Sequence, residues 1–121
     1  MFRSPQDVHK KVLGKTGEKA AAEYLKKRGC IILKTNYKTP FGEADIIAQD
    51  VSRGEIAFVE VKTRTGDNYG TPAEAVGAKK RERYRKIAAY YWTQTGVEPN
   101  ARFDVAEVLA DGTIEYIEYA F

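Results

Sequence analysis

The chain has 121 residues, of which 43% are hydrophobic and 31% are charged, and its formal net charge is +3. This length suits one domain with a real core, and this composition argues against long disordered regions. The mild net charge does not by itself indicate a nucleic-acid partner, so the distribution of the charges matters more.

Residues 1–7 hold no apolar run, so we expect no signal peptide, and no stretch of the chain approaches membrane length. Cys30 is the single cysteine, so no intramolecular disulfide can form. A reducing compartment, the cytoplasm, is therefore the simplest location.

Residues 1–13 are predicted to form a flexible N-terminal segment, and residues 14–121 a single domain. The tripeptide Gly14-Lys15-Thr16 matches part of a phosphate-binding loop. That motif needs another glycine five positions before Gly14, where His9 stands. His9 has no partner at metal-ligand spacing either, so we predict a surface residue there.

A helix is predicted from Gly17 to Arg28, because its apolar residues, among them Ala21 and Leu25, recur on one face. Glu18 lies at the end of this face. It is interpreted either as a first-turn acid favoured by the helix dipole or as a group that points towards a site on the sheet. Spacing alone favours the first interpretation.

Three strands are predicted next, at residues 31–37, 42–47 and 55–64. The third is unusual because it carries charge on one face. Its odd face carries Ala57, Val59, Val61 and Thr63, whereas its even face passes from Phe58 to Glu60 and Lys62. Ionised groups are costly to bury unless they are paired or bind a metal, so this pair marks a candidate site.

The loop at residues 50–54 is polar and ends in glycine, which is typical of a hairpin. If the hairpin is centred in this loop, Asp45 lies opposite Glu60, with Cβ atoms about 4.5–5.5 Å apart. Two opposed carboxylates call for a compensating cation, which is either Lys62 or a divalent metal ion.

A second helix is predicted from Thr71 to about Thr95, opened by a capping box. In this box Glu74 is a cap rather than a metal ligand. Tyr90, Tyr91 and Trp92 are predicted to belong to the core more than to a base-stacking surface, because they recur at helical spacing.

The same helix holds the densest positive charge of the chain, either a solvated face or a surface for phosphates. One of its lysines, Lys80, lies in line with the predicted buried stripe. The residues that we expect to bind nucleic acid are Lys79, Lys80, Arg81, Arg83, Lys86 and, at the end of the third strand, Arg64.

Residues 101–109 and 113–119 are predicted to form a final pair of strands. For Asp104 we favour a structural partnership with Arg102 over metal binding. The resulting order, α-β-β-β-α-β-β, predicts an α/β fold in which helices flank a mixed central β-sheet, with the second helix as a crossover.

Asp45 followed by Glu60-Val61-Lys62 resembles the D…(D/E)-x-K signature of the restriction-endonuclease-like nuclease superfamily. Over residues 12–119 the chain resembles the small bacterial YraN family, whose members are predicted endonucleases similar to archaeal Holliday-junction resolvases. The matching blocks are Gly17-Glu18 with Ala21 and Tyr24-Leu25, then residues 42–45, 58–64, 70–76 and 102–105.

This resemblance implies a restriction-endonuclease-like fold and a metal-dependent endonuclease that acts on DNA, especially branched or otherwise structured DNA. Asp45, Glu60 and the Val61 carbonyl would bind Mg²⁺, or Mn²⁺, and Lys62 would position or deprotonate the attacking water. Glu18 matches a helix acid that reaches the metal site in related resolvases. Those resolvases are dimers, so by analogy the resemblance also implies a homodimer.

Two other interpretations remain open. In the first, the nuclease-like domain is a non-catalytic scaffold that binds nucleic acid. In the second, the acids are structural and Lys62 bridges Asp45 and Glu60. The resemblance also places a family lysine at Lys80, close to the acids.

Overall fold

The computed structural model describes residues 5–64 and 77–121, with side chains described at residues 16–64 and 77–121. Within these ranges the elements follow the predicted order α-β-β-β-α-β-β, so the predicted fold class is confirmed. They are α1 (Pro5–Lys27), β1 (Cys30–Thr39), β2 (Gly42–Asp50), β3 (Glu55–Thr63), α2 (Ala78–Thr95), β4 (Ala101–Val108) and β5 (Ile114–Ile117).

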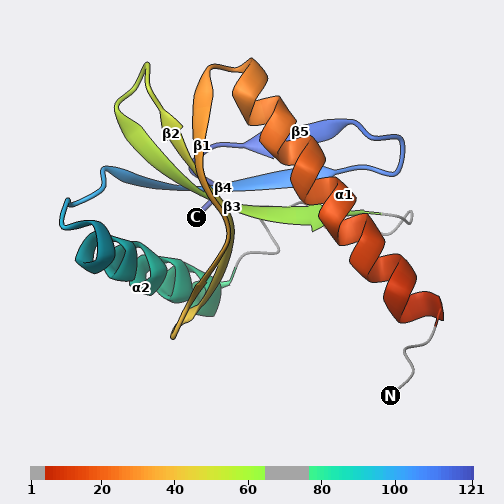
Figure 1. The fold of residues 1–121 in the computed structure, drawn as a ribbon, viewed down its shortest axis with the longest axis horizontal. Coiled ribbons are helices and arrows are strands. Elements are labelled where there is room, and N and C mark those ends of the chain that lie inside the picture. Colours follow the sequence, from red (N-terminus) through yellow and green to blue (C-terminus); the bar gives the residue numbers. More distant parts are fainter. Residues whose placement is uncertain (1–4, 65–76) are drawn as a thin grey trace.

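The described strands form one mixed sheet in the order β1-β2-β3-β4-β5 (Figure 1). All neighbouring pairs are antiparallel except β3 and β4, which are parallel. Helix α2 joins this parallel pair as the predicted crossover. The two helices lie on opposite faces of the sheet (Figure 1). No helix in the described part of the chain combines the length and apolar character needed to cross a bilayer.

The alternation of β3 divides the core into two layers, as predicted. Ala57 and Val59 are fully buried in the cluster that α1 covers, together with Leu25. Phe58 points to the opposite face and is fully buried against Ile87 of α2. Because successive strand residues alternate between faces, Glu60 and Lys62 follow Phe58 onto the α2 side.

The β2–β3 hairpin has the predicted register. Its ladder runs from Asp50 opposite Glu55 to Ile46 opposite Val59. One further step of the same register brings Asp45 to Glu60. At this step the ladder ends, and the Val61 backbone N–H donates a hydrogen bond to Asp45 Oδ2 at 2.7 Å.

The predicted start of the first helix is wrong. Helix α1 begins at Pro5 rather than Gly17, so it includes residues 5–13. That residues 1–13 are flexible stays a prediction. Proline suits the first position of a helix, since its fixed φ angle is already helical and its missing N–H is not needed there. The helix then continues through Gly14 and Gly17, although a glycine in a helix costs about 1 kcal/mol relative to alanine.

The predicted start of the second helix is also wrong. Helix α2 begins at Ala78, because Gly77 before it is extended (φ −85°, ψ 171°). The predicted capping box, with Thr71 and Glu74, lies outside the described residues. The C-terminal end agrees with prediction, since Gly96 adopts a left-handed conformation (φ 76°) after Thr95 and donates its backbone N–H to the Trp92 carbonyl.

The aromatic residues near the end of α2 divide between core and surface. Tyr91 packs edge-on against Phe58, with ring centroids 5.7 Å apart, as expected for a core residue. Trp92 was predicted to be core but is 44% exposed. A helix that covers one face of a sheet must turn successive residues away from it, so three adjacent aromatic residues cannot all face the core.

Arg102 forms a buried charge network on the α1 side of β4. Its Nε donates to Asp104 Oδ2 at 2.9 Å, and its Nη1 donates to Asp50 and Glu55 at 2.8 and 3.0 Å. The Tyr116 hydroxyl donates a further hydrogen bond to Asp104. The prediction that Asp104 is a structural partner of Arg102 is therefore confirmed.

Candidate active site

Asp45 is half-buried at the point where β2 and β3 separate. Burial, helped by the negative charges of Glu18, Glu60 and Glu43, raises the pKa of its carboxyl group to about 6, although the hydrogen bond from the Val61 N–H acts in the opposite direction. A carboxylate that is this costly to ionise is stabilised by any cation brought close to it.

Glu60 has one oxygen that is paired and one that is not. Lys80 of α2 donates its Nζ to Glu60 Oε1 in an ion pair. Glu60 Oε2 is buried and has no hydrogen-bond partner among the described residues. The expectation that Lys80 reaches the acids is thus confirmed, and the free oxygen is a candidate ligand atom, since a buried unsatisfied polar atom is costly to maintain without a function.

Lys62 follows Glu60 on the same face of β3. Burial lowers the pKa of its ammonium group, and the positive charges of Lys80 and Arg64 lower it further, while Glu60 and Glu107 oppose them. A lysine with a lowered pKa exchanges protons more readily near neutral pH, which is what a general base requires.

Glu107 belongs to this cluster and was not predicted from the sequence. It lies opposite Lys62 in the parallel β3–β4 pair and is 2% exposed. Arg64 Nε donates to Glu107 Oε1 at 2.7 Å, whereas Glu107 Oε2 has no partner among the described residues. Arg64, expected to bind nucleic acid, thus directs its guanidinium into the cluster rather than outward.

Glu18 approaches the site from α1. At Gly17 an added Cβ would lie 2.4 Å from the Thr63 hydroxyl oxygen, so only glycine allows α1 to lie this close to the end of β3. The half-buried Glu18 therefore stands near enough for its charge to raise the pKa of Asp45. Across the described residues, however, no three acidic, histidine or cysteine side chains converge into a ready-made metal site.

The oxygen atoms present nevertheless suit a magnesium ion. Mg²⁺ keeps several water ligands and is held by one or two carboxylates together with substrate phosphates, not by an all-protein cage. Asp45 and the unpaired Glu60 Oε2 supply two carboxylates, and the Val61 carbonyl belongs to the residue whose N–H binds Asp45. The residues present therefore fit this ion.

Comparison with known proteins places the chain in a family. Residues 17–108 match the family described as "Uncharacterised protein family UPF0102". The chain belongs to this family. A UPF0102 protein from Alkaliphilus metalliredigens is 45% identical over 92% of this chain and 98% of its own length. Another, from Symbiobacterium thermophilum, is 50% identical over 79% of this chain and 80% of its own.

A solved structure shows the same fold. Archaeoglobus fulgidus Hjc, described as a Holliday junction resolvase from an archaeal hyperthermophile, aligns with a TM-score of 0.53 over 88% of this chain and 77% of its own. The two sequences are 21% identical, so the match concerns the fold. The predicted restriction-endonuclease-like fold is therefore confirmed. The predicted resemblance to the YraN family is confirmed too, because UPF0102 is the same family.

In this UPF0102 protein the cations of α2 face in different directions. Lys80 points to the acids, as described above. Lys79, Arg81, Arg83 and Lys86 are exposed. The stem of Arg83 packs against Gly42, where an added Cβ would meet Arg83 Cδ at 2.7 Å, so this cation lies beside the β1–β2 hairpin.

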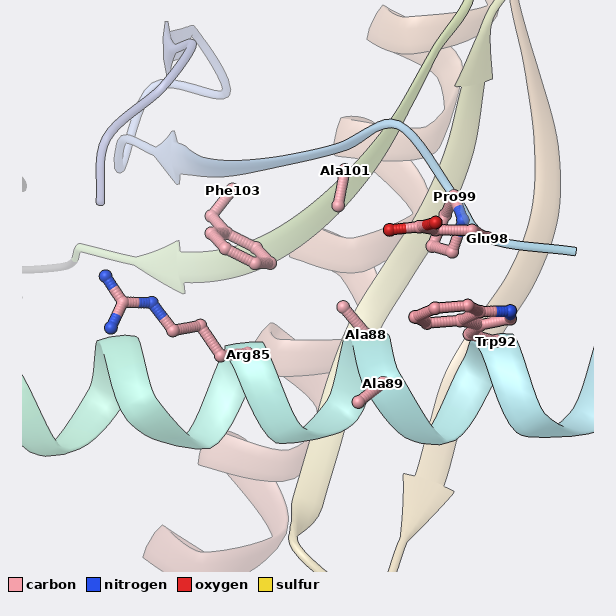
Figure 2. A pocket seen from close by; sticks show the side chains of 8 residues that line it. All are labelled: Arg85, Ala88, Ala89, Trp92, Glu98, Pro99, Ala101 and Phe103. Atoms are coloured by element: carbon pink, nitrogen blue, oxygen red, sulfur yellow. The ribbon is translucent and has the colours of Figure 1, made fainter.

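Arg85 lies on another side of the helix. It makes a long ion pair with Glu82 at 3.8 Å and lines an apolar hollow between α2 and the segment that leads into β4. Figure 2 shows the exposed Trp92 in this hollow, beside Pro99. Asp45, Glu60 and Glu107 do not line the hollow, so it is separate from the candidate active site.

Proposed function

We propose that this protein is a metal-dependent endonuclease that cleaves phosphodiester bonds in DNA. The observation that carries the proposal is the convergence of Asp45, Glu60 and Lys62 at the end of β3, where one buried carboxylate oxygen is unpaired. The fold shared with a protein described as a Holliday junction resolvase supports the reaction class and favours branched DNA as substrate.

In the proposed mechanism, Asp45, Glu60 and the Val61 carbonyl hold Mg²⁺ or Mn²⁺, with Glu18 available for a second position. The bound ion supplies Lewis-acid polarisation of the phosphate and neutralises developing negative charge. Lys62 orients the attacking water and, in the neutral form that its lowered pKa favours, accepts its proton as the water oxygen bonds to phosphorus. The P–O bond to the leaving sugar oxygen breaks, and that oxygen takes a proton from solvent.

The ammonium group of Lys80 contacts different partners before and after substrate binds in this proposal. Without substrate it neutralises Glu60, since the two side chains form an ion pair. With substrate its ammonium group can turn to the reacting phosphate, where a fixed positive charge stabilises the transition state. The exposed cations of α2, among them Lys79 and Arg83, hold the flanking phosphates.

The test is cleavage of labelled four-way, flap and linear DNA in the presence of Mg²⁺ or Mn²⁺. Glu60→Gln should lower the single-turnover rate on the order of a thousandfold, because a ligand charge is lost, yet leave the protein folded. Glu23→Gln, at an exposed acid of α1 that pairs with Lys26, is the matched control and should leave the rate unchanged. Cleavage that survives Glu60→Gln would overturn these roles.

The ion pair between Lys80 and Glu60 favours one competing function, a DNA-binding module whose acids are neutralised internally. Titration calorimetry with Mg²⁺ in the presence of a non-cleavable DNA separates the two. Heat of metal binding that Asp45→Asn abolishes supports the endonuclease, whereas no metal binding supports the binding module. Light scattering with a four-way junction tests the homodimer that two symmetric cuts would require.

A further inference from the structure

The tip of the β1–β2 hairpin presents an aromatic ring to solvent. Phe41 is 47% exposed in the turn between the two strands. The turn is held by Thr39, whose hydroxyl donates to the Gly42 carbonyl at 2.7 Å and accepts from the Phe41 backbone N–H at 3.1 Å. The ring is therefore displayed by a turn with its own hydrogen bonds.

Helix α2 supports this ring from behind. Tyr90 meets Phe41 edge-on with ring centroids 6.5 Å apart, and Lys86 Nζ lies 5.8 Å from the Phe41 centroid. Arg83 packs its stem beneath Gly42. The hairpin tip is thus an aromatic surface with two cations beside it, and nearly half of Phe41 remains open to a further flat partner.

This combination fits a nucleotide better than an apolar protein surface. A base has a π face that stacks on an aromatic ring whatever its sequence, and the phosphates on either side of it attract the cations. An apolar partner would instead bury Lys86 and Arg83 without compensation. Bases inside a duplex are already stacked on one another and must be unstacked at an energetic cost before a ring can enter, so a ring at a hairpin tip favours an unpaired base.

The tip also lies at a useful distance from the acids. From Lys80, which contacts Glu60, to Lys86, which contacts Phe41, the chain rises about 9 Å along the axis of α2. The acids and the hairpin tip are therefore contacted from neighbouring turns of the same helix, so one bound DNA strand can reach both.

We propose that Phe41, with Lys86 and Arg83, forms a stacking platform for an unpaired base on the strand whose phosphate is held at the acids. The proposal rests on the endonuclease function and names its substrate class, DNA with a single-stranded branch or end. The platform would select such DNA over continuous duplex.

The experiment compares two DNA molecules, a blunt duplex and the same duplex with a single-stranded overhang, by fluorescence anisotropy in EDTA so that no cleavage occurs. The wild type should prefer the overhang. Phe41→Ala should weaken overhang binding about tenfold and leave duplex binding unchanged, whereas Phe41→Trp should retain the preference. Trp92→Ala removes an equally exposed aromatic ring from the hollow of Figure 2 and should change neither affinity.

Equal losses for both DNA molecules in Phe41→Ala, or an overhang preference that survives it, would overturn the platform. Circular dichroism melting confirms that each variant is folded. The endonuclease proposal is judged separately, by wild-type cleavage with Mg²⁺. A wild type that cleaves DNA while Phe41→Ala keeps its overhang preference refutes the platform alone, and a wild type that prefers overhangs without cleaving refutes the endonuclease alone.

Discussion

Asp45 accepts a hydrogen bond from the backbone N–H of Val61 at 2.7 Å, across the point where β2 and β3 part. This hydrogen bond fixes the carboxylate beside Glu60 and brings the Val61 peptide against it. The hydrogen bond lowers the pKa of Asp45, but burial and nearby acids outweigh it and leave the pKa at about 6. The hydrogen bond from Val61 therefore holds the Asp45 carboxyl group in a buried position where its ionisation is costly.

This balance predicts how stability depends on pH. The folded-state pKa of Asp45 is raised from 3.8, so its contribution to stability is present below the unfolded pKa and is lost as the pH rises through about 6. Asp45→Asn, which keeps an oxygen for the Val61 N–H, should remove this loss. At about pH 8 it should raise the free energy of unfolding by about 2 kcal/mol, after allowance for partial exposure.

Urea unfolding at about pH 4 and about pH 8 measures this effect. Added Mg²⁺ should stabilise the wild type at the higher pH but not Asp45→Asn, because a ligand that binds only the folded state raises its stability. Glu23→Gln, on the exposed face of α1, is the exposed-acid control. The prediction is contradicted if the free energies of unfolding of Asp45→Asn and the wild type differ by the same amount at both pH values.

The positive face of α2 yields a prediction about salt. Lys79, Arg83 and Lys86 recur at helical spacing on one face, whereas Arg85 points to the hollow of Figure 2. Replacing the first three with glutamine should weaken binding to all DNA sequences and reduce the log–log salt slope by about 0.9 for each phosphate that is no longer neutralised. Arg85→Gln should leave the slope unchanged.

Fluorescence titrations over a range of salt concentrations give both slopes. If Arg85→Gln reduced the salt slope as much per charge, DNA binding would depend on the total charge of α2 and not on one face of it. An unchanged slope in the triple variant would place the DNA on another surface of the molecule.

The register that brings Asp45 next to Glu60 was predictable because it needs only local rules. A strand alternates with a period of two, and a hairpin keeps the sum of its paired residue numbers constant, so a loop at residues 50–54 fixes the partner. The same alternation predicted which face of β3 each core residue occupies. Local patterns also predicted the crossover order of the elements.

Glu107 was not predictable in this way. Its place beside Lys62 depends on β4 pairing parallel to β3 in one register, and the two strands are separated by the whole of α2. The sequence did contain one indication of this acid. Phe103, Val105 and Glu107 share one face of their strand, so an apolar face ends in an acid there, as it does from Phe58 to Glu60 in β3. The start of α1 was missed because glycine weakens a helix locally, while the close approach to Thr63 at Gly17 is a tertiary interaction.

The buried network on the α1 side predicts a large loss of stability. Arg102 is 3% exposed and Asp104 is fully buried, so Arg102→Ala leaves an uncompensated buried charge. We expect a loss of about 3–5 kcal/mol in the free energy of unfolding. Arg53→Ala removes an exposed arginine that pairs with Glu118 and should cost far less, because solvent screens such a pair. Chemical denaturation of both variants decides, and similar costs would refute a structural role for the network.

Lys79 and Lys80 are adjacent in sequence but differ in surroundings, which makes them a matched pair. Lys80 donates to Glu60, whereas Lys79 is exposed. A charge held at the reacting phosphate acts mostly in the transition state, so Lys80→Ala should lower the single-turnover rate about a hundredfold with little effect on DNA affinity. Lys79→Ala should show the reverse, a several-fold weaker Kd and a nearly unchanged rate.

The ion pair offers a second observable that distinguishes Lys80 from a simple phosphate-binding cation. Removing Lys80 leaves Glu60 without its cation, so Lys80→Ala should bind Mg²⁺ more tightly in the absence of DNA, because the ion no longer competes with the ammonium group. Lys79→Ala should bind Mg²⁺ as the wild type does. Calorimetry with Mg²⁺ tests the expected gain in metal affinity, and single-turnover cleavage tests the expected loss of rate, each on both variants. Losses that are confined to affinity and equal for both lysines would mean that Lys80 only binds a flanking phosphate and that its pairing with Glu60 has no part in the chemistry.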